Sequence, residues 1–188
     1  ALMMRIDIFI IEYYSRVGGT LESNELGHFS AAFSLGLILP MITNSIVKVA
    51  FPSISQVSYV SDVDKYISSI KKAILPVSVA VLLFDLLVVV IVNTFFYQKY
   101  GESISVFLLI SLATIISFFT NLMIPFFYAS NKTFFIAKLG LIQLIVNMLA
   151  SFFFISFFGA LGAAISILIV RIIGVIVVGA NIKIVKEG

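Results

Sequence analysis

Chemistry in this sequence could come from the few ionisable side chains that interrupt long apolar stretches. A charged group at the centre of a membrane-spanning helix costs at least about 2.5–3.5 kcal/mol, so it normally faces a cavity, a partner or water. Arg171 and Asp85 each lie near the middle of such a stretch. They predict an ion pair that locks two helices together, or a charge relay that takes part in ion coupling, or an arginine that faces a phosphate group.

The first apolar stretch carries two further charged residues, Arg5 and Asp7. Residues two apart point to different faces of a helix, so these two are not simply each other's partners. Arg5 could bind an anionic group, because its planar guanidinium matches phosphate oxygens, or it could form an ion pair with another part of the protein. Asp7 is a further candidate for ion coupling, because a proton or Na⁺ gradient could act on a carboxylate inside the membrane.

A polar stripe along the second apolar stretch ends at Asn44 and Lys48. Lys48 lies near the end of the stretch, so it either extends its ammonium to the membrane surface or marks the cationic mouth of a cavity. Asn44, one turn earlier, would then contribute to substrate binding. Pro40 sits in the middle of the stretch and removes a backbone hydrogen bond, which predicts a kink or a hinge.

Nothing in the sequence predicts an enzyme or a metal site. The chain has one histidine, His28, and no cysteine. No catalytic triad, zinc motif or phosphate-binding glycine loop accompanies this histidine, which is expected at a helix start beside the membrane surface. We therefore expect no catalytic residue, no metal, no cofactor and no direct use of ATP.

The composition indicates that the solvent of this chain is lipid. Of its 188 residues, 61% are hydrophobic and 11% are charged, whereas soluble domains are about 45–50% apolar and about 25% charged. This excludes a disordered chain, a disulfide-rich scaffold and a nucleic-acid binder. An α-helical span needs about 20 mostly apolar residues. The sequence therefore predicts an all-α, polytopic transmembrane helix bundle.

Five full spans and one partial span are expected in a single transmembrane lobe that covers residues 1–188. The partial span indicates a six-helix lobe whose first helix is truncated, and hence a fragment of a longer protein. The predicted spans are residues 1–15 (partial), 29–51, 73–96, 104–128, 134–157 and 160–182.

The basic residues outside the spans, together with Lys138 near the start of the span 134–157, predict the orientation of the chain. Arg16 and Lys99 lie on one side of the membrane. Seven lie on the other: Lys65, Lys71, Lys72, Lys132, Lys138, Lys183 and Lys186. Because cytoplasmic loops carry the excess of Lys and Arg, the second side, with the C-terminus, is predicted to be cytoplasmic.

Several short segments occur in a suggestive order along the chain. They are Arg-Ile-Asp-Ile-Phe-Ile-Ile at 5–11, Glu-Leu-Gly-His-Phe-Ser-Ala-Ala at 25–32, Phe-Pro-Ser-Ile-Ser at 51–55, Ala-Ser-Asn-Lys at 129–132 and Phe-Gly-Ala-Leu-Gly-Ala-Ala at 158–164. Together they resemble the C-terminal half of polysaccharide biosynthesis flippases, the Wzx-type O-antigen flippases of the multidrug/oligosaccharidyl-lipid/polysaccharide exporter superfamily. Two residues depart from that pattern: Phe29 replaces the usual Tyr, and Asp85 replaces an apolar or small residue.

The resemblance implies a fold of two six-helix lobes around a central cavity, of which this chain would be the second. It implies that the protein flips undecaprenyl-diphosphate-linked oligosaccharide across the prokaryotic cytoplasmic membrane, with both termini in the cytoplasm. Arg5 and Lys48 would then attract the diphosphate. The implied partners are this lipid-linked oligosaccharide, membrane lipid and the missing N-terminal lobe, and a polysaccharide polymerase or glycosyltransferases could also associate. Nucleic acid is not among them.

Two other functions stay open at the level of the sequence. A multidrug or cation antiporter of the same superfamily would need acidic residues to dominate the cavity, and the spans carry cations and carboxylates in nearly equal number. A membrane scaffold that does not transport could dock glycosyltransferases through the basic segment 62–72.

Overall fold

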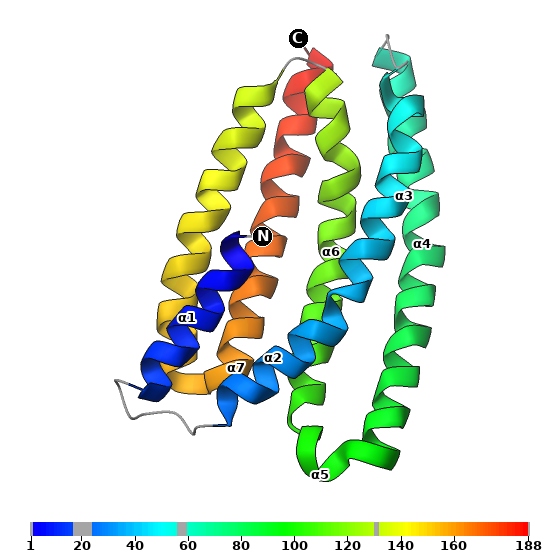
Figure 1. Ribbon diagram of the computed structural model, residues 1–188. Helices are drawn as coiled ribbons and strands as arrows, with labels where there is room; N and C mark the ends of the chain where they lie inside the picture. The colour runs from blue at the N-terminus through cyan, green and yellow to red at the C-terminus, as the bar shows by residue number, and fades with distance from the viewer. Residues whose placement is uncertain (1, 17–23, 56–59, 130–131, 188) are drawn as a thin grey trace.

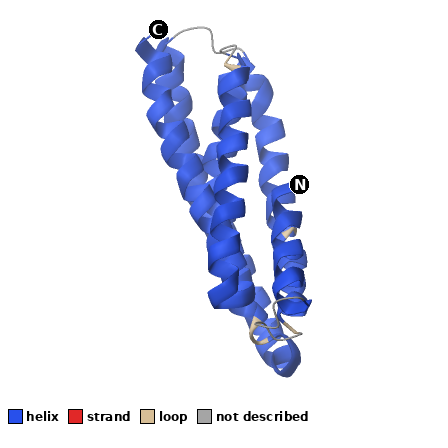
Figure 2. Ribbon diagram, turned by 90° about the vertical axis from the view of Figure 1, so that its left-hand side faces the viewer, coloured by secondary structure: helices blue, strands red, loops and turns tan. Residues whose placement is uncertain are grey.

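The computed structural model describes residues 2–16, 24–55, 60–129 and 132–187, and this part of the chain is helical apart from short turns (Figure 1, Figure 2). The elements in chain order are α1 (Leu2–Arg16), α2 (Glu25–Gly36), α3 (Ile38–Ser55), α4 (Val60–Ile91), the π-helical segment η1 (Val92–Phe96), α5 (Tyr97–Tyr100), α6 (Ser103–Ala129) and α7 (Thr133–Glu187).

Four helical stretches of the described chain are long and apolar enough to cross a membrane. They are Glu25–Ile46, Ile74–Tyr100, Ser103–Tyr128 and Thr133–Asn181. The prediction of an all-helical protein with several membrane spans is therefore confirmed. The last stretch covers 49 residues, more than twice the roughly 20 that one crossing needs.

This last stretch folds back on itself at Gly159. The backbone there has φ 55° and ψ −130°, a combination that only glycine adopts readily. Figure 1 shows the two arms of α7, residues 133–158 and 160–187, running side by side in opposite directions. The turn is crowded, because a Cβ atom built on Gly159 would lie 2.6 Å from a carboxylate oxygen of Glu25.

The second apolar stretch is interrupted at Leu37, between α2 and α3. Pro40 has no N–H to donate to the carbonyl of Gly36, and its ring crowds that carbonyl, so the helix breaks one turn before the proline. Gly36 is buried, and a Cβ atom there would lie 2.9 Å from Cγ2 of Ile110 on α6. The helical stretch thus bends beside this close contact between α2 and α6.

Helix α6 forms the centre of the bundle. It packs against α7, α2, α3 and α4, while α1 packs against α7 and α2 (Figure 1). Its side chains Phe107, Phe118 and Phe127 are each 1% exposed. The bundle core is therefore built around one apolar helix rather than around a central channel.

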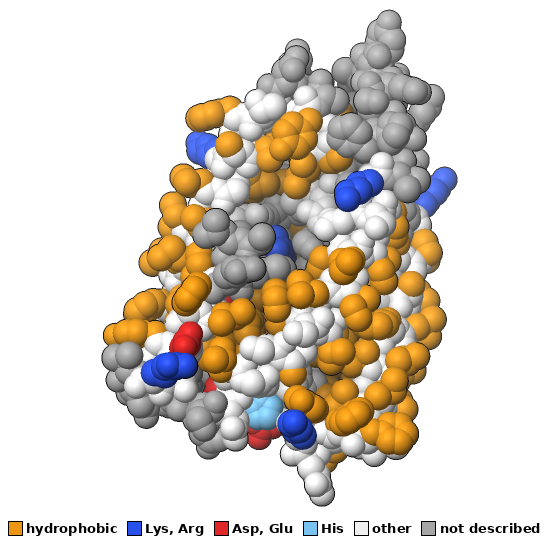
Figure 3. Space-filling view, viewed as in Figure 1, with side chains coloured by type: hydrophobic (Ala, Val, Ile, Leu, Met, Phe, Trp, Pro, Cys, Tyr) orange, Lys and Arg blue, Asp and Glu red, His pale blue; other side chains and the backbone are white. Residues whose placement is uncertain are grey.

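The outside of the bundle is apolar as well. On α4, Leu75 and Leu83 are largely exposed, and on α7, Leu149 and Phe157 are too. Figure 3 shows hydrophobic side chains over most of the visible face. A surface of this kind would be unstable in water and is suited to contact with lipid hydrocarbon.

Figure 1 groups the connections at two ends of the bundle. The α3–α4 and α6–α7 junctions lie at the same end as the C-terminal part of α7, and α5 and the turn at Gly159 lie at the opposite end. The predicted orientation depends on assigning these connections to the same two sides of the membrane. Helix α1 covers only the half of the bundle nearer the second end.

Replacement of Gly159 by alanine is expected to destabilise the protein by about 1–3 kcal/mol, because a side chain strains this backbone conformation. The matched control is Gly140→Ala, on the first arm of α7, where a Cβ atom would meet nothing within 4 Å. Thermal unfolding in detergent measures both. The tight turn at Gly159 is contradicted if Gly159→Ala melts at the same temperature as Gly140→Ala.

Candidate functional site

The most deeply buried carboxylate in the described chain is that of Asp7 on α1, which is 0% exposed. Its Oδ1 accepts a hydrogen bond from Nδ2 of Asn147 (3.0 Å) and another from the hydroxyl of Ser151 (2.5 Å), both on the first arm of α7. Asn147 and Ser151 are four residues apart, so they lie on one helix face and can reach a single acceptor. The three side chains form what we call the Asp7 cluster.

The Asp7 cluster is suited to hold a proton or a small cation. The second carboxylate oxygen, Oδ2, is buried and accepts no hydrogen bond from any described residue. No basic side chain forms an ion pair with Asp7 in the described structure. A carboxylate in such a place is stabilised either by taking a proton on Oδ2 or by binding a cation there, since an unpaired buried charge is costly.

Replacement of Ser151 by alanine should destabilise the protein by about 1–3 kcal/mol, because it leaves a buried carboxylate with one donor fewer. Ser156→Ala on the same arm is the control, because the Ser156 hydroxyl bonds only to the carbonyl of Phe153 in its own helix. Unfolding in detergent gives both values. Equal stability of the two variants would mean that the Ser151–Asp7 contact contributes nothing.

The second buried carboxylate, Asp85 on α4, is 6% exposed. Its Oδ2 accepts a 2.6 Å hydrogen bond from the hydroxyl of Ser111 on α6. The structure corrects the ion pair expected between Asp85 and Arg171, since no such pair forms. The reason is the packing order, because α6 lies between α4 and α7 and takes the contact that Arg171 was expected to make.

Double-mutant cycles should distinguish these two partners of Asp85. The pair Asp85→Ala and Arg171→Gln is expected to show a coupling within about 0.5 kcal/mol, since the residues share no contact. The pair Asp85→Ala and Ser111→Ala should couple by roughly 0.5–3 kcal/mol, because the residues are bonded. Unfolding free energies of the single and double variants test this, and a larger coupling to Arg171 than to Ser111 would contradict the packing order.

The remaining predicted site residues lie apart from the Asp7 cluster. Arg171 is half-buried on the second arm of α7 and forms no ion pair with a described residue. Lys48 and Asn44 are exposed on α3. Pro40 is half-buried beside the break at Leu37, and whether this break acts as a hinge stays a prediction.

Arg5 belongs to α1, but its side chain lies outside the described residues. Its contact with an anionic group therefore stays a prediction from the sequence. No described contact joins any two of the predicted site residues to each other. Among those whose side chains the structure describes, Asp7 and Asp85 have hydrogen-bond partners on a neighbouring helix.

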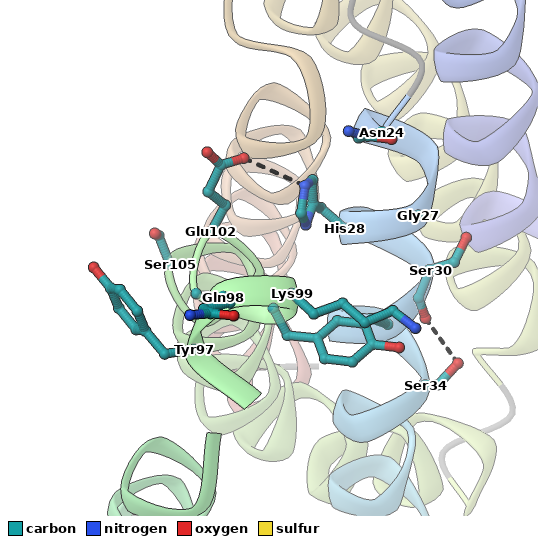
Figure 4. A pocket seen from close by; sticks show the side chains of 13 residues that line it. Asn24, Gly27, His28, Ser30, Ser34, Tyr97, Gln98, Lys99, Glu102 and Ser105 are labelled. Carbon is teal, nitrogen blue, oxygen red and sulfur yellow. Dashed lines mark hydrogen bonds and ion pairs between the residues drawn. The ribbon is translucent and has the colours of Figure 1, made fainter. Parts of the chain in front are cut away.

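A hollow, which we call the end cavity, lies between α2 and the α5–α6 region at the end of the bundle that holds α5 (Figure 4). It has a volume of about 1220 Å³. His28 forms part of its wall, with Nδ1 3.3 Å from the hydroxyl of Ser103 and Nε2 3.3 Å from a carboxylate oxygen of Glu102. These contacts hold the imidazole between α2 and the start of α6.

Two of the short segments singled out in the sequence meet in the structure. Oε2 of Glu25, in segment 25–32, accepts a 2.7 Å hydrogen bond from the backbone N–H of Ala160, in segment 158–164. Ala160 opens the second arm of α7, so the carboxylate caps a helix start, where negative charge is favourable. The contact joins the beginning of α2 to the turn at Gly159.

Comparisons of the chain with protein-family models, with curated proteins and with solved structures gave no match. The function is therefore inferred from the contacts described above.

Sequence reasoning located the buried carboxylates but not their partners. The four-residue spacing of Asn147 and Ser151 was a usable signal, because it places two donors on one helix face at the depth of a carboxylate. Ser111 gave no such signal, since small hydroxyl residues are frequent along α6. Glu102 could not be paired with His28 either, because they are 74 positions apart.

Proposed function

We propose that this chain is one lobe of an ion-coupled membrane transporter that flips undecaprenyl-diphosphate-linked oligosaccharide across the prokaryotic cytoplasmic membrane. The observation that carries the transport part is the Asp7 cluster, a buried carboxylate held between two helices of an apolar bundle. Ionisable groups within membrane spans mark ion or substrate pathways, because their burial is too costly to persist without use. The substrate is proposed from the resemblance of the sequence segments.

The meeting of Glu25 with Ala160 supports the family assignment within this proposal. The two segments involved are far apart in the sequence, and each resembles a separate motif of the flippases. A fold that brings both into one contact gives them a shared structural role, which is what a common architecture requires. In this view the two arms of α7 are two spans, and with α2–α3, α4 and α6 they make five crossings beside the partial span α1.

The mechanism we propose is alternating access driven by a change of charge at Asp7. A proton or Na⁺ that binds at Oδ2 neutralises the carboxylate. Its hydrogen bonds to the donors on α7 become weaker, so α1 can move relative to α7. The break at Leu37 lets the two parts of the α2–α3 span bend separately. Arg5, Lys48 and Asn44 would bind the diphosphate and its first sugar on the cytoplasmic side.

Complementation of a bacterial strain that lacks its own flippase tests this proposal. The strain accumulates lipid-linked oligosaccharide on the inner leaflet, and the full-length protein that carries this chain should restore export. Asp7→Asn should reach normal membrane abundance yet fail to restore export, because an amide cannot cycle between charged and neutral forms. Ser156→Ala should restore export fully, because its hydroxyl touches only its own helix.

The same experiment distinguishes the other two functions. A cation or multidrug antiporter, which a buried carboxylate such as Asp7 would also suit, would confer drug efflux but leave the oligosaccharide inside. A scaffold that docks glycosyltransferases would give neither export nor efflux. Full export by an abundant Asp7→Asn protein would remove Asp7 from the coupling mechanism.

A further inference from the structure

The end cavity continues into a second, apolar pocket. This apolar pocket has a volume of about 330 Å³ and shares two wall residues, Ala31 and Tyr100, with the end cavity. Its other walls are almost wholly hydrocarbon, and include Leu35 of α2, Phe96 of η1 and Phe107 of α6. A polar basin and an apolar pocket thus meet at one wall, between helices of a bundle, where ligand sites commonly form.

The polar basin contains one ammonium, that of Lys99, and one carboxylate, that of Glu102, which do not pair with each other. Figure 4 shows Lys99 extending from α5 into the cavity toward the α2 side, where Ser30 and Ser34 lie. The Lys99 ammonium lies 5.4 Å from the centre of the Tyr100 ring and forms no ion pair with a described residue. The acidic residue of the cavity, Glu102, faces His28 instead.

The shape of the apolar pocket has a local cause in the chain. Residues Val92–Phe96 form the π-helical segment η1, and a π-helical turn is wider than an α-helical one and is frequent at functional sites. Val92 and Phe96 of this segment both line the pocket, next to Ile91 at the end of α4. The irregular turn therefore builds a wall that a continuous α4 would place elsewhere.

We propose that the end cavity and the apolar pocket together bind one phospholipid. Its anionic phosphate lies at Lys99 in the polar basin, and one of its hydrocarbon chains lies in the apolar pocket past Ala31 and Tyr100. A lysine is a common point-charge partner for phosphate, and ligand sites often form between the helices of a bundle. This lipid is separate from any transported substrate, and the proposal does not depend on the transport function.

The site should select lipids by their headgroup. A lipid chain moves from hydrocarbon to hydrocarbon when it enters the apolar pocket, so it gains packing contacts, which hold the phosphate beside Lys99, but gives no preference between lipids with the same chains. The ammonium of Lys99, in contrast, gains a charge-assisted contact that it lacks in the free protein. A neutral lipid with the same chains should therefore bind more weakly than an anionic one, and free phosphate, which leaves the apolar pocket empty, should not compete.

Native mass spectrometry of the purified full-length protein in detergent tests the site. The probes are phosphatidylglycerol, diacylglycerol with the same chains, and inorganic phosphate. Lys99→Gln should weaken phosphatidylglycerol binding about tenfold, the order expected for loss of one charge-assisted hydrogen bond. Lys138→Gln is the matched control, because Lys138 is an exposed lysine on α7 at the other end of the bundle.

A second variant tests the apolar half of the site. Ala31→Leu narrows the passage between the end cavity and the apolar pocket. It should weaken phosphatidylglycerol binding, while the thermal unfolding temperature stays within a few degrees of that of the wild type. The proposal is overturned if Lys99→Gln binds phosphatidylglycerol as well as Lys138→Gln does, or if diacylglycerol binds as tightly as phosphatidylglycerol. It is also overturned if inorganic phosphate displaces the lipid, because the apolar pocket would then have no part in binding.

Discussion

The structure depends on one constraint of a hydrocarbon solvent, which is that a buried polar group must find its hydrogen bonds inside the protein. One carboxylate oxygen of Asp7 satisfies this with Asn147 and Ser151, and one carboxylate oxygen of Asp85 satisfies it with Ser111. Each contact also chooses a neighbour, since it ties α1 to α7 and α4 to α6. Apolar packing alone discriminates weakly between helix partners in lipid, because lipid chains are as apolar as leucine. The polar contacts therefore give the bundle its specific arrangement.

The irregular parts of the chain follow from local chemistry and are not distributed evenly. Pro40 breaks the second apolar stretch at Leu37, and Gly159 reverses α7. The segment η1 widens the end of α4 and leads into α5. Gly159, η1 and α5 all lie at the end of the bundle that carries the end cavity (Figure 1). The regular helices form the frame of the bundle, and α5 and η1 at this end line the end cavity and the apolar pocket.

The helices were predictable from sequence because their signal is strong and local. Long apolar stretches are enough to predict an all-helical bundle with several membrane spans. The side-chain partners were not predictable, because they depend on which helices become neighbours. Depth along the membrane favoured an Asp85–Arg171 pair, yet depth says nothing about lateral position, and α6 lies between the two helices. Only part of the Asp7 cluster was predictable. The spacing of its donors could be read from the sequence, but their acceptor lay about 140 positions away.

The long separation of these contacts has a consequence for biogenesis. Asp7 meets Ser151 across 144 positions, Tyr14 meets the carbonyl of Phe152 across 138, and Glu25 meets Ala160 across 135. A ribosome delivers the N-terminal helices first, so the carboxylates of Asp7 and Glu25 leave it long before their partners exist. Helices α1 and α2 are therefore made before the α7 hairpin that supplies these donors. Until α7 is inserted, the two carboxylates lack these hydrogen bonds, so damage to the α7 hairpin would also weaken the hold on α1 and α2.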